Sequence, residues 1–279
     1  MTEQPWAGGR WSERVRCVLA PNPGPMTLDG TNTYVLAEPG SGRAVVVDPG
    51  PDDAAHLDAV ERALDGRTAE VVLLTHGHAD HAEGAGSFAD RTGCPVRSLD
   101  PAHRRGSAGL ADGDTLDVDG LRLEVVGTPG HTSDSVSLVL PAEGLLLTGD
   151  TLLGRGTTVV AHPDGRLSAY LDSLRRLEAL ARRLGGLTLL PGHGPAGADV
   201  AELVGHYRRH RRQRLEQVVT AVAGGAGDAE QVVEQVYAEV PRPLWPAATA
   251  SVLAQLDHLG EAGRLRRVDG RWRLSEPDA

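Results

Sequence analysis

The chain has 279 residues, which is long for one domain and suits one large and one small domain. Hydrophobic residues make up 40% of it and charged residues 24%, as in an ordinary globular protein with a sizeable core. The net charge of -10 argues against a protein that coats nucleic acid nonspecifically, because such a protein would be basic. A local basic site stays open.

The N-terminal stretch MTEQPWAGGRWSERVRC lacks the apolar core of a secretion signal. No run approaches the roughly 18 apolar residues that a membrane span needs. We therefore expect a cytoplasmic protein without a membrane partner. Cys17 and Cys94 lie far apart and outside any C-x-x-C pattern, which predicts two buried, reduced thiols.

The stretch TLDGTNTY, residues 27–34, is interpreted as a hairpin that turns at an Asp-Gly pair. Its polar tip would place Asn32 and Thr33 over a site, where both are candidate substrate contacts. As a plain turn the same residues need no function, so both interpretations are kept.

Four short apolar runs predict buried strands, because each is rich in Val and Leu and stops at Gly or Pro. A polar residue follows each run: Asp48, the cluster that begins at His76, Asp150 and His193. Ligand sites of layered α/β folds form at such strand ends, because loops leaving one sheet edge converge.

The segments between these runs predict helices and half-covered strands. Residues 52–64 and 167–184 have helical character, the latter with leucines three or four apart. Residues 121–126 and 135–140 alternate between apolar and polar side chains, which favours strands covered on one face. The mixture predicts two packed sheets with helices outside.

After about residue 200 the pattern changes. A charged helix over 202–222 is followed by helices over 229–239 and about 247–262, then by a hairpin that turns at Asp269-Gly270. Three helices and a hairpin are typical of a winged-helix module. We predict two domains, residues 1–205 and 206–279.

The densest polar cluster is His76, His78, Asp80 and His81, in the spacing H-x-H-x-D-H. Imidazole and carboxylate groups suit Zn²⁺ or a similar transition metal, and the absence of Cys favours a hydrolytic over a structural site. The alternative is a solvated turn with coincidental histidines. Other candidate ligands at strand ends are each preceded by Gly: His131, Asp150 and His193.

These seven residues resemble the metallo-β-lactamase superfamily, because they reproduce its order H-x-H-x-D-H…H…D…H. The resemblance implies an α+β fold, a four-layer αβ/βα sandwich, with two Zn²⁺ ions per chain; Mn²⁺ or Fe²⁺ would accept the same ligands. It assigns His76, His78 and His131 to one metal and Asp80, His81 and His193 to the other, with Asp150 as the bridge.

Two such metals would make hydroxide available at neutral pH, because each lowers the pKa of bound water toward about 7. Asp80 would also orient the nucleophile and help to protonate the leaving group; His193 is the second candidate catalytic residue. Asp48 is a candidate to hold a ligating imidazole, or merely caps the turn at Pro49-Gly50. Thr75 and Ser133 are further candidates for hydrogen bonds that support the ligands.

Longer stretches resemble the beta-lactamase-like-protein-two branch of this superfamily. They are residues 22–36, GDTLLGRGTTVV, YLDSL, LLPGHGP and HRRQRLEQV, together with the winged-helix order. That branch includes a single-stranded RNA endonuclease, and fungal thioesterases of this fold share much of the pattern. The loop 161–166, AHPDGR, departs from the branch by its length and adds His162, either a surface residue or a substrate contact.

The resemblance predicts a metal-dependent hydrolase in which a metal-bridging hydroxide attacks a phosphodiester of single-stranded RNA. Arg208, Arg211 and Arg212 would bind phosphate; alternatively they form a solvated helix face paired with Glu202 and Glu216. The second hypothesis is a hydrolase of small thioesters, of the hydroxyacylglutathione or acyl-carrier type. A β-lactamase and a winged-helix DNA regulator are remote alternatives, and a homodimer is left open.

Overall fold

The computed structural model describes residues 6–276, and the chain divides into two compact units. The first comprises the chain up to Thr128 with Asp134–Thr158 and Leu177–Ala201. The second comprises Pro129–Ser133, Val159–Arg176 and the chain from Glu202 onward. The last division of the chain falls between Ala201 and Glu202, and two earlier segments group with the C-terminal part. The boundary predicted after residue 205 stays a prediction.

Two sheets form the first unit. The six-stranded sheet has the order β1-β2-β3-β4-β5-β6: Gly9–Arg10, Val15–Leu19, Asn32–Leu36, Arg43–Val47, Thr68–Leu73 and Val96–Arg97. The five-stranded sheet has the order β11-β10-β9-β8-β7: Thr188–Pro191, Leu145–Gly149, Val136–Leu140, Leu121–Gly127 and Thr115–Val118. The four apolar runs are β4, β5, β10 and β11, as predicted; β4 pairs with β5, and β10 with β11, in parallel.

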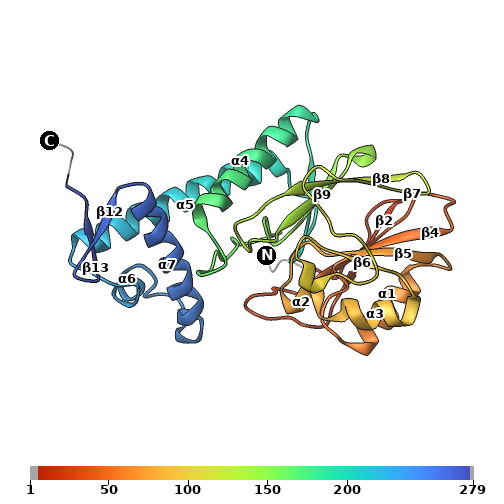
Figure 1. The fold of residues 1–279 in the computed structure, drawn as a ribbon, viewed down its shortest axis with the longest axis horizontal. Coiled ribbons are helices and arrows are strands. Elements are labelled where there is room, and N and C mark those ends of the chain that lie inside the picture. The colour runs from red at the N-terminus through yellow and green to blue at the C-terminus, as the bar shows by residue number, and fades with distance from the viewer. Residues whose placement is uncertain (1–5, 277–279) are drawn as a thin grey trace, which may run out of the picture. The chain divides into compact units, whose positions relative to one another are not determined.

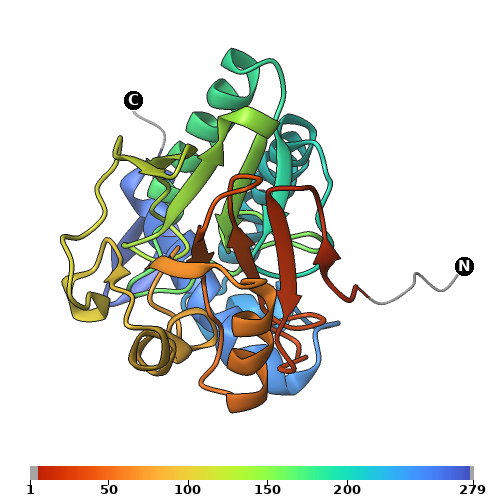
Figure 2. The ribbon, with the colours of Figure 1, turned by 90° about the vertical axis from the view of Figure 1, so that its right-hand side faces the viewer.

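The core of this unit lies between the sheets (Figure 2). Val47 and Leu73 of the first sheet share one buried cluster with Leu123 and Leu138 of the second. Both faces of β10 are buried, which explains why its sequence is continuously apolar rather than alternating. Burial on this scale, at about 25 cal/mol per Å² of apolar surface, is the main stabilising contribution.

Helices α1 (Ala54–Ala63) and α3 (Gly84–Thr92) cover the outer face of the first sheet (Figure 1). Val46 and Val72 point to this side and pack in one cluster with Leu57 and Phe88. Asp53 begins α1, because its side chain accepts a hydrogen bond from the His56 N–H at 2.8 Å.

The two cysteines are buried and free, as predicted. Burial raises the pKa of Cys17 to about 12, and burial likewise raises the pKa of Cys94. Both thiols therefore stay protonated and are part of the core.

The second unit contains three helices and a hairpin in winged-helix order. They are α5 (Val200–Ala223), α6 (Ala229–Val236), α7 (Trp245–Glu261) and the strands β12 (Leu265–Val268) and β13 (Arg271–Leu274). Helix α4 (Leu167–Arg183) begins in this unit. Helix α6 ends three residues before the predicted residue 239, and α7 begins at Trp245 because Pro246 suits a first helical turn. Within residues 6–276, no helix is long and apolar enough to cross a membrane.

Candidate metal centre

The predicted H-x-H-x-D-H cluster follows β5. His76 and His78 lie in the loop, and the short helix α2 (Ala79–Ala82) begins directly after His78. Asp80 and His81 lie in that one turn of helix, which turns them back toward the strand end. The loop therefore presents four side chains around a small volume without a long excursion of the chain.

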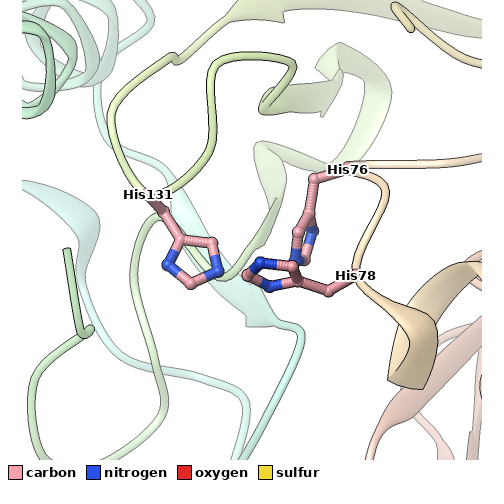
Figure 3. Close-up of side chains that lie close together, drawn as sticks. All are labelled: His76, His78 and His131. Carbon is pink, nitrogen blue, oxygen red and sulfur yellow. The ribbon is translucent and has the colours of Figure 1, made fainter. Parts of the chain in front are cut away.

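The other strand ends bring the remaining candidates to the same place. Ligand atoms within 4.8 Å of one another define three groups: His76, His78 and His131 (Figure 3); His76, His81 and Asp150; and Asp80, His81 and His193. All seven predicted ligands belong to at least one group. His76 and His81 each belong to two, so the groups form one continuous centre.

The ligand atoms of four of these residues, His81, His193, Asp150 and Asp80, lie especially close together. His81 Nε2 lies 3.2 Å from His193 Nε2, and Asp150 Oδ1 lies 3.4 Å from each of them. Asp80 Oδ2 lies 3.1 Å from His193 Nε2. The histidine side chains are fully buried, whereas the Asp80 side chain is 29% exposed. Asp80 is therefore the most exposed of these four residues.

The far nitrogens of three of the imidazoles, those of His81, His131 and His193, contact acceptors. His81 Nδ1 lies 2.8 Å from Asp48 Oδ2, His193 Nδ1 lies 3.1 Å from the Gly30 carbonyl oxygen, and His131 Nδ1 lies 2.7 Å from the Val159 carbonyl oxygen. Each Nδ1 must donate its N–H there, which leaves the lone pair on Nε2.

Two Nε2 lone pairs 3.2 Å apart, with carboxylate oxygens beside them, repel one another unless a proton or a metal cation lies between them. This donor set of imidazole nitrogens and carboxylate oxygens fits Zn²⁺, Mn²⁺ or Fe²⁺. The residues therefore fit a divalent transition metal.

The pKa values of His81, His193 and Asp150 also shift in the direction that favours positive charge at the histidines and negative charge at the aspartate. Burial opposes charge on His81, but the Asp150 and Asp48 carboxylates outweigh it and hold the His81 pKa well above its usual value. Burial likewise opposes charge on His193, while Asp150 and Asp80 bring the His193 pKa to about 9. Burial also opposes charge on Asp150, yet His81 and His193 hold the Asp150 pKa well below normal.

Asp48 and Thr75 make the contacts expected of groups that support a ligand. Asp48 Oδ1 accepts a hydrogen bond from the Thr75 N–H at 2.8 Å, and Asp48 Oδ2 accepts one from the Thr75 hydroxyl at 2.6 Å. The second oxygen is also the one that faces His81. Asp48 has a φ of 49°, a left-handed conformation that Asp tolerates better than most residues. The carboxylate thereby turns inward from the end of β4.

Gly192, which precedes His193, is required by space. A Cβ at this position would lie 2.6 Å from Asp150 Oδ1 and 2.7 Å from His81 Cε1. Any side chain there would occupy the metal centre itself.

The structure corrects the predicted hairpin over residues 27–34. Asn32 and Thr33 lie within β3 and are fully buried, with no exposed tip. The Asn32 amide N–H groups donate to the carbonyl oxygens of Pro191 and Gly194, both at 2.9 Å. Asn32 therefore holds the loop that carries His193. The Thr33 hydroxyl donates to the Asp48 carbonyl oxygen at 2.6 Å and lies 2.9 Å from His56 Nε2.

Three contacts in this network were not predicted. The Trp6 indole N–H donates to Asn32 Oδ1 at 2.7 Å, which fixes the orientation of the amide. The carbonyl oxygens of Gly30 and Val159 orient two of the imidazoles. A backbone carbonyl group is present in every residue, so the sequence could not have indicated the contacts of Gly30 and Val159. Of the three contacts, only that of Trp6 involves a side chain that the sequence could have singled out.

The other predicted residues stay predictions. Ser133 is exposed, and its N–H donates to the Asp164 carboxylate. Arg211 is 4% exposed, with its guanidinium carbon 5.0 Å from the centre of the Tyr170 ring, whereas Arg212 is exposed and Arg208 is half-buried. His162 is half-exposed, 3.6 Å from the Asp257 carboxylate.

Residues 26–193 match the metallo-beta-lactamase superfamily, and residues 229–272 match the beta-lactamase associated winged helix domain. The chain belongs to the metallo-beta-lactamase superfamily. A beta-lactamase-like protein 2 homolog of Caenorhabditis elegans is 33% identical over 264 residues, 90% of this chain and 86% of that protein. This agrees with the branch predicted from the sequence.

Two further members of the superfamily bear on structure and chemistry. A beta-lactamase domain protein from Burkholderia ambifaria has a TM-score of 0.82 and 26% identity, covering 98% of this chain and 96% of that one. An atrochrysone carboxyl ACP thioesterase of Aspergillus novofumigatus is 32% identical over 248 residues, 82% of this chain and 71% of that protein. The chain is thus a hydrolase of the metallo-beta-lactamase fold, a fold that implies divalent metal binding.

Proposed function

We propose that this chain is a dinuclear metal hydrolase that cleaves phosphodiester bonds in single-stranded RNA. The metal-dependent part of this proposal is supported by the positions of His81, His193 and Asp150, because their facing ligand atoms require positive charge between them. Bound there, divalent metals supply Lewis acidity and make hydroxide available at neutral pH.

The protein's own contribution is to fix positions. Asp48 and the Gly30 carbonyl hold two imidazoles in the tautomer that presents Nε2, so no reorganisation is needed when the substrate arrives. Asp80, which is partly exposed, would orient the attacking water, accept the proton that the water loses, and then pass this proton to the leaving oxygen.

The choice of RNA rests on the winged-helix unit. Arg209 and Arg212 are exposed on α5, and within residues 6–276 no carboxylate pairs with either. Exposed guanidinium groups without acidic partners suit a phosphate backbone. This supports a polyanionic substrate although the whole chain carries a net charge of -10.

Thioester hydrolysis is the second candidate. The observation that favours it is the similarity to the Aspergillus acyl-carrier-protein thioesterase, 32% identity over 248 residues. The same centre would serve it, since a carbonyl oxygen also develops negative charge during attack.

One experiment separates the two. Metal-loaded protein is mixed with an end-labelled single-stranded RNA and, separately, with an acyl-carrier-protein thioester. An Asp80→Ala variant and a chelated sample run beside both. We expect RNA cleavage that is lost in both controls. Thioester turnover without RNA cleavage, with metal confirmed bound, would overturn the RNA substrate and leave the hydrolase intact.

A further inference from the structure

A cavity of about 760 Å³ lies within the second unit, between α5 and the segment from the end of α6 to Leu244. Its volume falls in the range of roughly 300 to 1,000 Å³ that small-molecule sites occupy. No predicted site residue lines it, so the metal centre does not account for it.

One wall is polar and comes from α5. His210, Gln213, Arg214 and Gln217 lie three or four residues apart, so they share one helix face. The facing segment is largely apolar and contributes Val236, Val240, Pro241 and Leu244, with Tyr237 between them. Among the lining residues Glu239 is the single acid, and it lies on this second wall.

Arg214 and Tyr237 form a stacked pair at the boundary of the two walls. The guanidinium carbon lies 4.7 Å from the centre of the Tyr237 ring. Arg214 Nη1 donates to Gln217 Oε1 at 3.0 Å and to the Val236 carbonyl oxygen at 3.3 Å, which fixes the plane of the guanidinium. A planar guanidinium held in this way offers a flat surface for stacking and N–H groups for an anion.

His210 adds a second polar group. Its Nδ1 is buried and has no hydrogen-bond partner within residues 6–276. Burial, together with Arg211 and Arg214, lowers the His210 pKa to about 4, so the ring is neutral at pH 7. A neutral imidazole and glutamine amides both donate and accept hydrogen bonds, which is what the edge of a nucleobase requires.

We propose that this cavity binds one unpaired nucleotide, with its base between the apolar wall and the Arg214–Tyr237 pair, its edge against His210 and Gln213, and its phosphate beside Arg214. The chemistry is specific because a base has apolar faces and a polar edge, as the two walls do. The inference rests on the proposed function, since the single-stranded RNA substrate proposed above would supply this nucleotide.

The test measures binding without cleavage. Chelated protein is titrated into a fluorescein-labelled single-stranded RNA of mixed sequence, and anisotropy gives the Kd. We expect Arg214→Gln to raise the Kd roughly tenfold, because it removes both stacking and charge. Gln235 also lines the cavity. The double variant Gln213→Ala with Gln235→Ala leaves the charge unchanged and should raise the Kd roughly threefold, because contacts to the base edge are lost.

Arg175→Gln is the matched control for charge. Arg175 is exposed on α4, pairs with Asp172 and lies outside the cavity. Its Kd should stay within roughly twofold of the unchanged protein, since one peripheral charge contributes little. Competition with adenosine monophosphate distinguishes an RNA strand from a free nucleotide as the ligand. If adenosine monophosphate displaces the labelled RNA only at a far higher concentration than unlabelled RNA does, the ligand is a strand. If both displace it at the same concentration, the ligand is a free nucleotide.

Photo-crosslinking locates the contact. RNA carrying 4-thiouridine should attach to residues 210–217 or 235–244. No binding, equal Kd values for Arg214→Gln and Arg175→Gln, or crosslinks only elsewhere would each overturn the inference. Binding is measured after a chelator has removed the metal, so it does not depend on cleavage. Binding with these crosslinks therefore supports the inference even if the RNA-cleavage test fails. Cleavage without these crosslinks leaves the proposed function standing.

Discussion

The metal centre and the exposed arginines of α5, Arg209 and Arg212, differ in how firmly the protein holds their polar side chains. In the metal centre, the far nitrogens of His81, His131 and His193 each lie within hydrogen-bond distance of a protein acceptor, so the ring positions are fixed in advance. On α5, Arg209 and Arg212 are exposed, and no carboxylate within residues 6–276 restrains them. Catalysis needs fixed ligand positions, whereas attraction of a polyanion tolerates mobile charges.

The largest effect is expected from the group that fixes His81. In Asp48→Asn the left-handed backbone is tolerated, but the amide cannot offer the same charged acceptor to His81 Nδ1. Metal affinity should fall roughly 10- to 100-fold, as for other partners of ligating histidines. Competition with a fluorescent chelator measures it.

Asp53→Asn is the matched control. Asp53 caps α1 through its carboxylate, and Asn caps a helix equally well. Its metal affinity should equal that of the unchanged protein. If Asp48→Asn binds metal as tightly as Asp53→Asn, Asp48 does not orient the ligand and the contrast with α5 weakens.

The next effect concerns the loop that carries His193. Asn32→Ala leaves the Pro191 and Gly194 carbonyl oxygens without their buried donor. The free energy of unfolding should fall by about 2 to 4 kcal/mol, and metal affinity should fall with it. Denaturant unfolding and metal titration measure the two.

Asn22→Ala serves as the comparison for Asn32→Ala. Asn22 bonds Thr31 but not the loop 191–194, and it is only partly buried. A loss of stability without loss of metal affinity is expected there. Equal metal affinity in the two variants would show that Asn32 supports the fold alone.

The smallest effect is a pH dependence in the second unit. The His210 pKa is depressed to about 4 in the folded chain, against about 6.5 when unfolded, so the unfolded state binds the proton first. The free energy of unfolding should therefore decline as pH falls from about 6.5 to about 4. His210→Gln should flatten that decline in thermal unfolding across this range, and an unchanged slope would contradict the assignment.

Residues close in sequence carried most of the site prediction. The spacing of His76, His78, Asp80 and His81 needs only one loop and one turn of helix, and the apolar runs mark the strand ends that bring His193 beside them. The winged-helix order followed in the same way from helical periodicity and the turn at Asp269-Gly270.

Contacts between distant parts of the chain explain the failures. Asn32 is a polar residue in a pattern that predicts a turn, yet it is buried because acceptors about 160 residues away satisfy its amide. Likewise, residues 129–133 and 159–176 group with the C-terminal unit, and no local pattern marks that division. The sequence alone does not show which distant residues come into contact, so it indicates neither the burial of Asn32 nor the grouping of these two segments.

The most direct test of the central claim is metal content per chain, measured by mass spectrometry of the unchanged protein and of Asp80→Ala after loading with zinc and desalting. We expect two ions per chain in the unchanged protein and about one in the variant, because Asp80 contributes to only one of the three ligand groups. Two ions per chain in both proteins, or one in both, would contradict this expectation.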